Sequence, residues 1–320
     1  MNSDSATTST YRSDPGGGPA DPKATRFVVL FIIGVIVALV LLLGRTEISR
    51  WYHAKATNAL SEKRYEDAVA AANQALEWDP ESETLFELRA FARMQAEDFE
   101  GCLADYDEMI AKAAEDDVRN EKDISPLARK ASVLHQIGRH AESLAIWDDI
   151  IEYRKKEFEL RDDYKSRYAY AMSLNNRAYM LGQAYSIAED REEFDVRGAL
   201  EQIRLALKVR KLDDDSVMID TLGYLLLLNE EPEEAVEELE KAVSLTKDEH
   251  GALRNRIQRE MQTASDQRPL QLALSELDKQ FSIILHHRGE AYEAVGEKEK
   301  AEKDLSEAKR LGFDPDKGIW

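Results

Sequence analysis

The sequence predicts an all-α chain in which one apolar helix precedes about six stacked helix pairs. From Trp51 onward, 270 residues contain only ten Gly and five Pro, about half the usual share of these two residues. The same stretch is rich in Ala, Leu, Glu and Lys, which favour helices. Small residues also recur at a fixed spacing, and one long apolar run stands near the beginning. Together these observations leave no room for a β-sheet.

The first segment, residues 1–26, is composed mainly of Ser, Thr, Asp, Gly and Pro. It has too few apolar side chains to offset the entropy lost when a chain is ordered. The composition therefore predicts a disordered tail over residues 1–26.

The next segment, Phe27–Gly44, reads FVVLFIIGVIVALVLLLG, eighteen residues without a charged or polar side chain. At about 1.5 Å per residue such a helix spans roughly 27 Å, the thickness of a thin hydrocarbon layer. The alternative is a cleaved signal peptide, but the apolar region is long and the following GRTEIS lacks a small-x-small cleavage site. The pattern predicts one transmembrane helix over residues 27–44.

The basic residues on the two sides of this predicted span give almost no preference for either orientation in the membrane. A short tail before an early span commonly stays in the cytoplasm while the following body is exported. We therefore expect a single-pass membrane protein with an extracytoplasmic body. The positive-inside rule adds little, since three basic residues precede the span and three follow it: Arg12, Lys23, Arg26, Arg45, Arg50 and Lys55.

The body is organised by small residues placed twelve positions apart. Ala56 precedes Ala68 by twelve, and Ala68 belongs to a helical stripe that begins at Tyr65, continues through Ala72 and Ala75, and precedes Pro80. Small residues at both points allow two antiparallel helices to approach closely. The spacing recurs between Ala90 and Cys102, Ala131 and Ser143, Gly223 and Ala235, and Gly289 and Ala301, and is lengthened between Ala178 and Ala199.

This pattern resembles the tetratricopeptide repeat family, whose units are 34-residue helix–turn–helix pairs. The match is best in the first unit, where Tyr65, Ala68, Ala75 and Pro80 stand in the family's places. The resemblance implies a right-handed superhelical solenoid of about six units over residues 45–315, followed by a tail at 316–320.

The interval between the fifth and sixth units is longer than the repeat period. It has a helical composition with one break, SDQRP. We expect the second helix of unit five to run to about Ala264 and the first helix of unit six to start near Pro269. These would form a long helical-hairpin insert around residues 247–281.

Charge and motifs exclude several functions. With 43 basic and 63 acidic residues the net charge is −20; residues 1–50 carry five basic and four acidic groups, so the remainder carries −21. This acidity argues against non-specific nucleic-acid binding. We find no phosphate loop and no catalytic motif, and the neighbours His286 and His287 point to different helix faces. We therefore expect no enzymatic activity, no cofactor and no metal site.

The resemblance implies a concave groove, lined by the first helix of each unit, that holds an extended peptide or a partner helix. The amides of Asn175 and Asn176 could pair with a peptide backbone, or they could cap or solvate an irregular helix. The acidic body favours a basic or apolar partner. Mapped by spacing, the groove candidates are Phe91, His135, Asn175, Asn176, Tyr179, Asp220, Tyr224 and His286.

We therefore expect a membrane-anchored, non-catalytic scaffold that binds proteins through this groove. One alternative is an oligomerising assembly factor that leaves the groove unused and forms a homodimer through the small-xxx-small pair Gly34 and Ala38 or through the uncapped end of the last repeat. A second alternative is the regulatory subunit of an enzyme.

Overall fold

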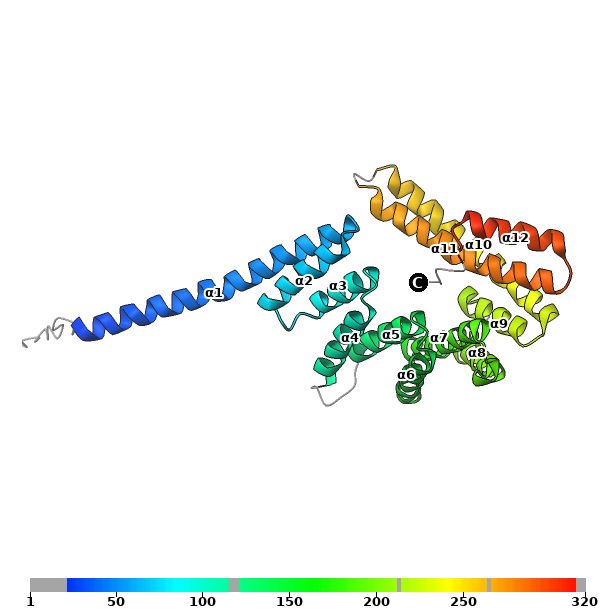
Figure 1. The fold of residues 1–320 in the computed structure, drawn as a ribbon, viewed down its shortest axis with the longest axis horizontal. Coiled ribbons are helices and arrows are strands. Elements are labelled where there is room, and N and C mark those ends of the chain that lie inside the picture. Colours follow the sequence, from blue (N-terminus) through cyan, green and yellow to red (C-terminus); the bar gives the residue numbers. More distant parts are fainter. Residues whose placement is uncertain (1–21, 115–120, 212–213, 264–265, 315–320) are drawn as a thin grey trace, which may run out of the picture. The chain divides into compact units, whose positions relative to one another are not determined.

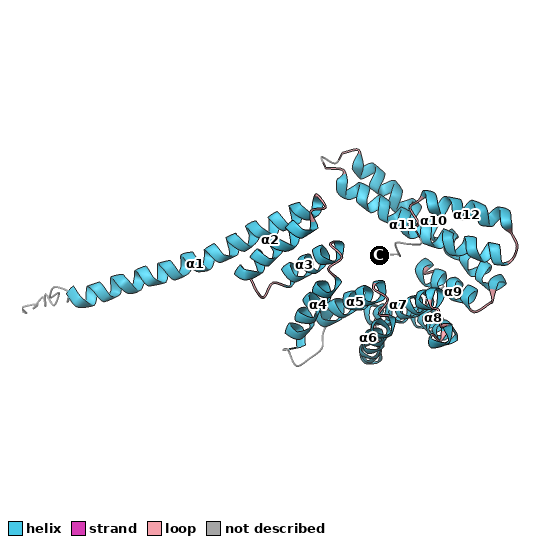
Figure 2. Ribbon diagram, viewed as in Figure 1, coloured by secondary structure: helices cyan, strands magenta, loops and turns pink. Residues whose placement is uncertain are grey.

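The computed structural model describes residues 22–114, 121–211, 214–263 and 266–314. These residues form twelve α-helices and the short 3-10 helix η1 (Arg191–Glu193), and no strand occurs among them (Figures 1 and 2). The chain divides into two compact units, Met1–Ala96 and Glu97–Trp320. Each unit is described by itself below.

The first unit consists of three helices, α1 (Pro22–Ser61), α2 (Tyr65–Trp78) and α3 (Glu83–Gln95). The last turns of α1 pack on α2 through a group of buried alanines, because side chains of this size let two helix backbones lie close together. Ala56 contacts α2, and Ala59 joins a cluster that extends to α3. The predicted stripe is fully buried at Ala68, Ala72 and Ala75.

Helix α1 requires a correction to the predicted membrane span. The apolar run 27–44 is the first part of a 40-residue helix that continues to Ser61. Among the described residues, no helix is both long enough and apolar enough to cross a membrane. This finding contradicts the predicted transmembrane helix and the predicted single-pass location. The prediction depended on an unbroken apolar run, and the structure describes the exposure of only five residues of that run: Phe27, Leu30, Phe31, Ile32 and Gly44.

Three other predictions lie outside the described residues, and one of them is the predicted tail at 316–320. The exposure and contacts of Gly34 and Ala38, the predicted dimer contact, are not described. The same holds for residues 1–21 of the predicted tail, whereas Pro22 already belongs to α1.

The second unit consists of nine α-helices and η1, arranged so that consecutive helices pack on each other (Figure 1). The helices pair as α5 with α6, α7 with α8, α9 with α10, and α11 with α12. Their bounds are α4 (Phe99–Ala114), α5 (Glu121–Gln136), α6 (His140–Arg161), α7 (Tyr164–Ile187), α8 (Val196–Arg210), α9 (Ser216–Leu228), α10 (Pro232–Met261), α11 (Arg268–Ala294) and α12 (Lys298–Arg310).

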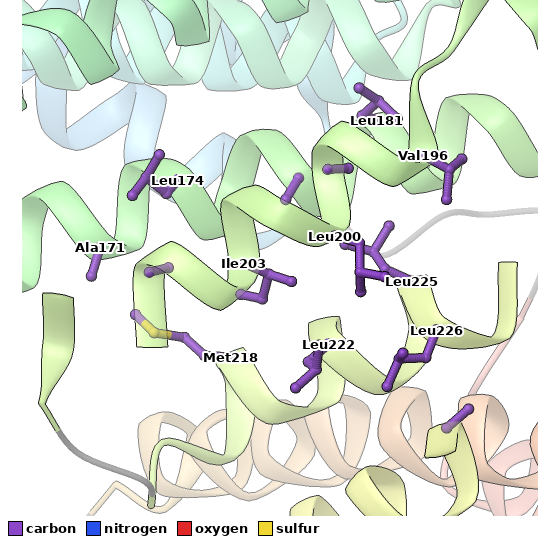
Figure 3. Packing of buried hydrophobic residues seen from close by; sticks show 14 of the residues in the cluster. Ala171, Leu174, Leu181, Val196, Leu200, Ile203, Met218, Leu222, Leu225 and Leu226 are labelled. Atoms are coloured by element: carbon purple, nitrogen blue, oxygen red, sulfur yellow. The ribbon is translucent and has the colours of Figure 1, made fainter. Parts of the chain in front are cut away.

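The largest apolar cluster of this unit lies between α7, α8 and α9 (Figure 3). The predicted small positions Ala178 and Ala199 are fully buried in it. At Gly223 an added Cβ would lie 2.5 Å from Leu239 Cγ, so α9 and α10 touch where the side chain is missing. The labelled members in Figure 3 are Ala171, Leu174, Leu181, Val196, Leu200, Ile203, Met218, Leu222, Leu225 and Leu226.

Helices α10 and α11 are the longest of the second unit, with 30 and 27 residues. They run side by side and extend well past α12 (Figure 1). Ile257 and Leu277 are buried in the extended part, and Arg254 forms an ion pair with Asp278 across it. Helix α10 ends at Met261 and helix α11 begins at Arg268. The sequence predicts these two boundaries near Ala264 and Pro269.

Candidate functional site

A cavity of about 270 Å³ lies within the second unit, and we call it the first-helix cavity. Its wall is built by the first helices of four successive pairs, α5, α7, α9 and α11, with one residue from α6. This arrangement follows from the repeat, because every first helix faces the same side. The lining residues are Ser132, Trp147, Asn175, Asn176, Tyr179, Met180, Val217, Asp220, Thr221, Gln280, Ile283 and Ile284.

The asparagine pair lies in the middle of α7. Asp163 is the N-cap of this helix. Its side chain accepts a hydrogen bond from the Ser166 backbone N–H, one of the free N–H groups of the first turn. Asn175 is only 3% exposed, and its Nδ2 donates to Oδ1 of Asn176 at 3.3 Å. The Asn175 Oδ1 atom is buried and has no hydrogen-bond partner among the described residues. Asn175 therefore holds an unused acceptor at the cavity.

Asp220 of α9 and His287 of α11 form a buried charged pair beside the cavity. His287 Nδ1 lies 3.0 Å and 3.1 Å from the two carboxylate oxygens of Asp220. Burial alone disfavours the protonated imidazole, but the Asp220 charge and hydrogen bond outweigh it, so the pKa of His287 is raised above its usual 6.5. The charge of Asp220 is thus balanced inside the fold.

Two tyrosines enclose this pair. The Tyr224 ring stacks on His287 at 4.4 Å between centroids, and Tyr179 lies 5.7 Å from Tyr224. Tyr224 Oη donates to the carbonyl oxygen of Gly182 at 3.4 Å. Burial raises the pKa of Tyr224 to about 12, and burial together with the Asp220 charge raises the pKa of Tyr179 well above 10. Both phenols are therefore neutral hydrogen-bonding groups.

An apolar wall completes the cavity. Trp147 Nε1 donates to Met180 Sδ at 2.9 Å, which holds the indole and the thioether together. Ile283 and Ile284 of α11 and Val217 of α9 also line the cavity. The cavity thus combines large apolar surfaces with a small number of polar groups, as ligand sites usually do.

The remaining sequence candidates lie elsewhere. His135 of α5 is buried with its Nδ1 3.1 Å from that of His140, and burial followed by the His140 charge lowers its pKa to about 4. His286 stacks on Phe313 at 4.0 Å. Phe91 belongs to α3 of the first unit, where it is 46% exposed.

The structure therefore brings Asn175, Asn176, Tyr179 and Asp220 to one cavity, with Tyr224 behind them. His287 is a functional neighbour that the sequence pattern does not predict as the partner of Asp220. The two residues are 67 positions apart, and no local pattern connects them. The one available signal was the unusual pair of adjacent histidines.

Comparisons with known proteins support the repeat assignment. A family model described as Tetratricopeptide repeat matches residues 50–82 and 219–249. The solved structure of the apo form of RapI is 14% identical, covers 82% of this chain and 98% of its own, and has a TM-score of 0.50. BtubC (BKLC) from P. vanneervenii is 18% identical, with coverages of 83% and 94% and a TM-score of 0.45.

A third similar structure is MamA, residues 41 to the end, from Desulfovibrio magneticus RS-1. It is 14% identical, covers 62% of this chain and 96% of its own, and has a TM-score of 0.42. No curated protein matches the sequence. Identities this low concern the fold alone. The chain is an all-α helical-repeat protein that contains tetratricopeptide repeats, as the spacing of its small residues predicts.

Proposed function

We propose that this protein is a non-catalytic scaffold that binds a protein or peptide partner at the first-helix cavity. The supporting observation is that four successive first helices contribute side chains to one cavity. A partner segment lying there would contact several repeats at once. Such a surface suits an extended chain, which can follow the repeats one after another.

The polar groups of the cavity fit a peptide backbone. A backbone offers one N–H donor and one C=O acceptor per residue, and the amides of Asn175 and Asn176 supply both kinds of partner. The net charge of −20 favours a basic or uncharged partner over an acidic one.

A photo-crosslinking experiment tests this proposal. Benzoylphenylalanine is placed at Val217, a cavity residue that is 51% exposed, and as a matched control at Leu205, which is 41% exposed on α8. In cells that express the protein, illumination is expected to give a discrete crosslinked product from position 217 and none from position 205.

The product should depend on the cavity. We expect Asn176→Ala together with Tyr179→Ala to reduce the crosslinked product from position 217 at least tenfold, while circular dichroism confirms that the variant is folded. A product that keeps its yield in this variant contradicts binding at the cavity.

A further inference from the structure

We infer that the first-helix cavity receives the indole side chain of a tryptophan from the bound partner. This inference rests on the proposed function, since it assigns a side chain to the same partner site. It is carried by three features of the cavity: its apolar walls, the unpaired acceptor of Asn175, and the balance of the Asp220 charge by His287.

The walls call for a large apolar group. Trp147, Met180, Ile283 and Ile284 line a cavity of about 270 Å³, which has room for one bulky side chain. An aromatic ring gains from contact with the Trp147 ring and with the Met180 sulfur. Tryptophan is also among the side chains that most often dominate binding at protein interfaces.

The unpaired acceptor calls for a hydrogen-bond donor. Asn175 Oδ1 is buried without a partner, which is unfavourable until a donor reaches it. The terminal torsion of asparagine is broad and roughly two-fold, so the amide can turn toward a donor in the cavity. An indole supplies one N–H and has no lone pair that would be left unsatisfied. Phenylalanine or leucine would leave Oδ1 unpaired, and a buried tyrosine hydroxyl would bring further lone pairs that need a donor.

The charges call for a neutral group. Asp220 is the carboxylate of the cavity, and His287 already balances it at 3.0 Å. A lysine or arginine side chain would therefore lose its hydration without finding a free counter-charge. A large, apolar, uncharged group with a single donor remains, and this is the description of indole.

Methionine-methyl NMR tests the inference with defined probes. The full chain is labelled at the methionine methyl groups, and the Met180 resonance reports on the cavity while Met94 of the first unit and buried Met218 serve as internal controls. The probes are N-acetyl-tryptophanamide and its 1-methylindole analogue, which has the same ring without the N–H. The tryptophanamide is expected to shift Met180 saturably at millimolar concentration, and the methylated analogue to bind about tenfold more weakly.

The acceptor is tested by substitution. In Asn175→Leu the two probes should bind equally, and in Asn175→Asp, which keeps an acceptor, the preference for the free N–H should remain. The comparison of the two probes on the unchanged protein needs no variant and stands even if Asn175→Leu fails to fold. Equal binding of the two probes to the unchanged protein overturns the inference, and so does tighter binding of N-acetyl-argininamide.

Two outcomes identify a different occupant or separate this inference from the proposed function. Binding seen only after Trp320→Phe would assign the site to this chain's own tryptophan, which overturns a partner residue. If no probe binds while the crosslink at Val217 persists, the indole inference fails and the protein-binding proposal stands. If the probe binds but position 217 gives no crosslink, the site takes a free indole and the assignment to a protein partner is overturned.

Discussion

At the scale of single residues, the pair of Asp220 and His287 places two ionisable groups inside the fold. Burying either charge alone is costly, and the pair is tolerable because both oxygens of the carboxylate lie close to Nδ1. The stacked Tyr224 ring keeps the imidazole in this orientation. Losing one partner would leave an uncompensated charge beside the cavity.

The raised pKa of His287 makes a prediction about pH. A folded-state pKa above 6.5 means that the pair stabilises the fold fully below pH 6.5 and loses this contribution as the pH rises through the raised value. Between pH 6.5 and 8.5 we expect the stability difference between the unchanged protein and His287→Gln to shrink by on the order of 1 kcal/mol. Urea unfolding followed by circular dichroism measures this difference.

In this pH range His135 does not contribute to the measured difference. His135 has its pKa lowered to about 4, so it stays neutral throughout the experiment. His286→Gln, one position away, is the matched control. A difference between the unchanged protein and His287→Gln that does not vary with pH would show that the imidazole is not charged in the fold.

At the scale of elements, packing between paired helices depends on positions where the side chain is small or missing. Gly223 meets Leu239 of α10 so closely that a Cβ would lie 2.5 Å from its Cγ. Gly251, also helical and within α10, has no atom within 4 Å of the same position. Close helix packing therefore requires a glycine at position 223, whereas position 251 has room for a side chain.

This contrast predicts opposite effects of one substitution. Gly223→Ala should destabilise the second unit by about 1–3 kcal/mol, because Leu239 and the backbone must move apart. Gly251→Ala should stabilise by roughly 0.5–1 kcal/mol, because alanine loses less backbone entropy in a helix. Chemical denaturation of the two variants measures both changes in the free energy of unfolding. Two changes of the same sign would contradict close packing at Gly223.

At the scale of the whole molecule, the negative net charge lowers the stability of the fold through electrostatic repulsion. A charge of −20 on 320 residues gives self-repulsion that the exposed i,i+4 ion pairs do not cancel, since such pairs contribute only about 0.3–0.5 kcal/mol each. Salt shortens the range of this repulsion from about 30 Å at 0.01 M to about 8 Å at 0.15 M.

We therefore expect added NaCl to raise the melting temperature. Between 0.01 M and 0.15 M the gain should be about 1 kcal/mol, or roughly 2–4 °C, as measured by differential scanning calorimetry at pH 7.5. Near the isoelectric pH of about 4.8 the effect should vanish. A melting temperature that falls with salt at pH 7.5 would show that ion pairs outweigh the repulsion.

Much of the fold follows from local pattern. The twelve-residue spacing of Ala56 with Ala68 and of Ala131 with Ser143 predicts paired helices, and all four residues are buried where the pairs touch. The place of Asn175, Asn176, Tyr179 and Asp220 on first helices also follows, because it depends only on their distance from the small residue of the same unit. The predicted membrane span was wrong, because no helix among the described residues is both long enough and apolar enough to cross a membrane.

The sequence by itself determined that the chain is helical, repetitive and acidic, because these properties arise from residues within a few turns of one another. The tertiary structure alone decided which polar groups meet. Asp220 contacts His287, which is 67 residues away in the sequence. His135 contacts His140 and does not line the cavity, and the Asn175 Oδ1 atom has no hydrogen-bond partner among the described residues. Such pairings depend on how successive helix pairs stack, and no local periodicity encodes that distance.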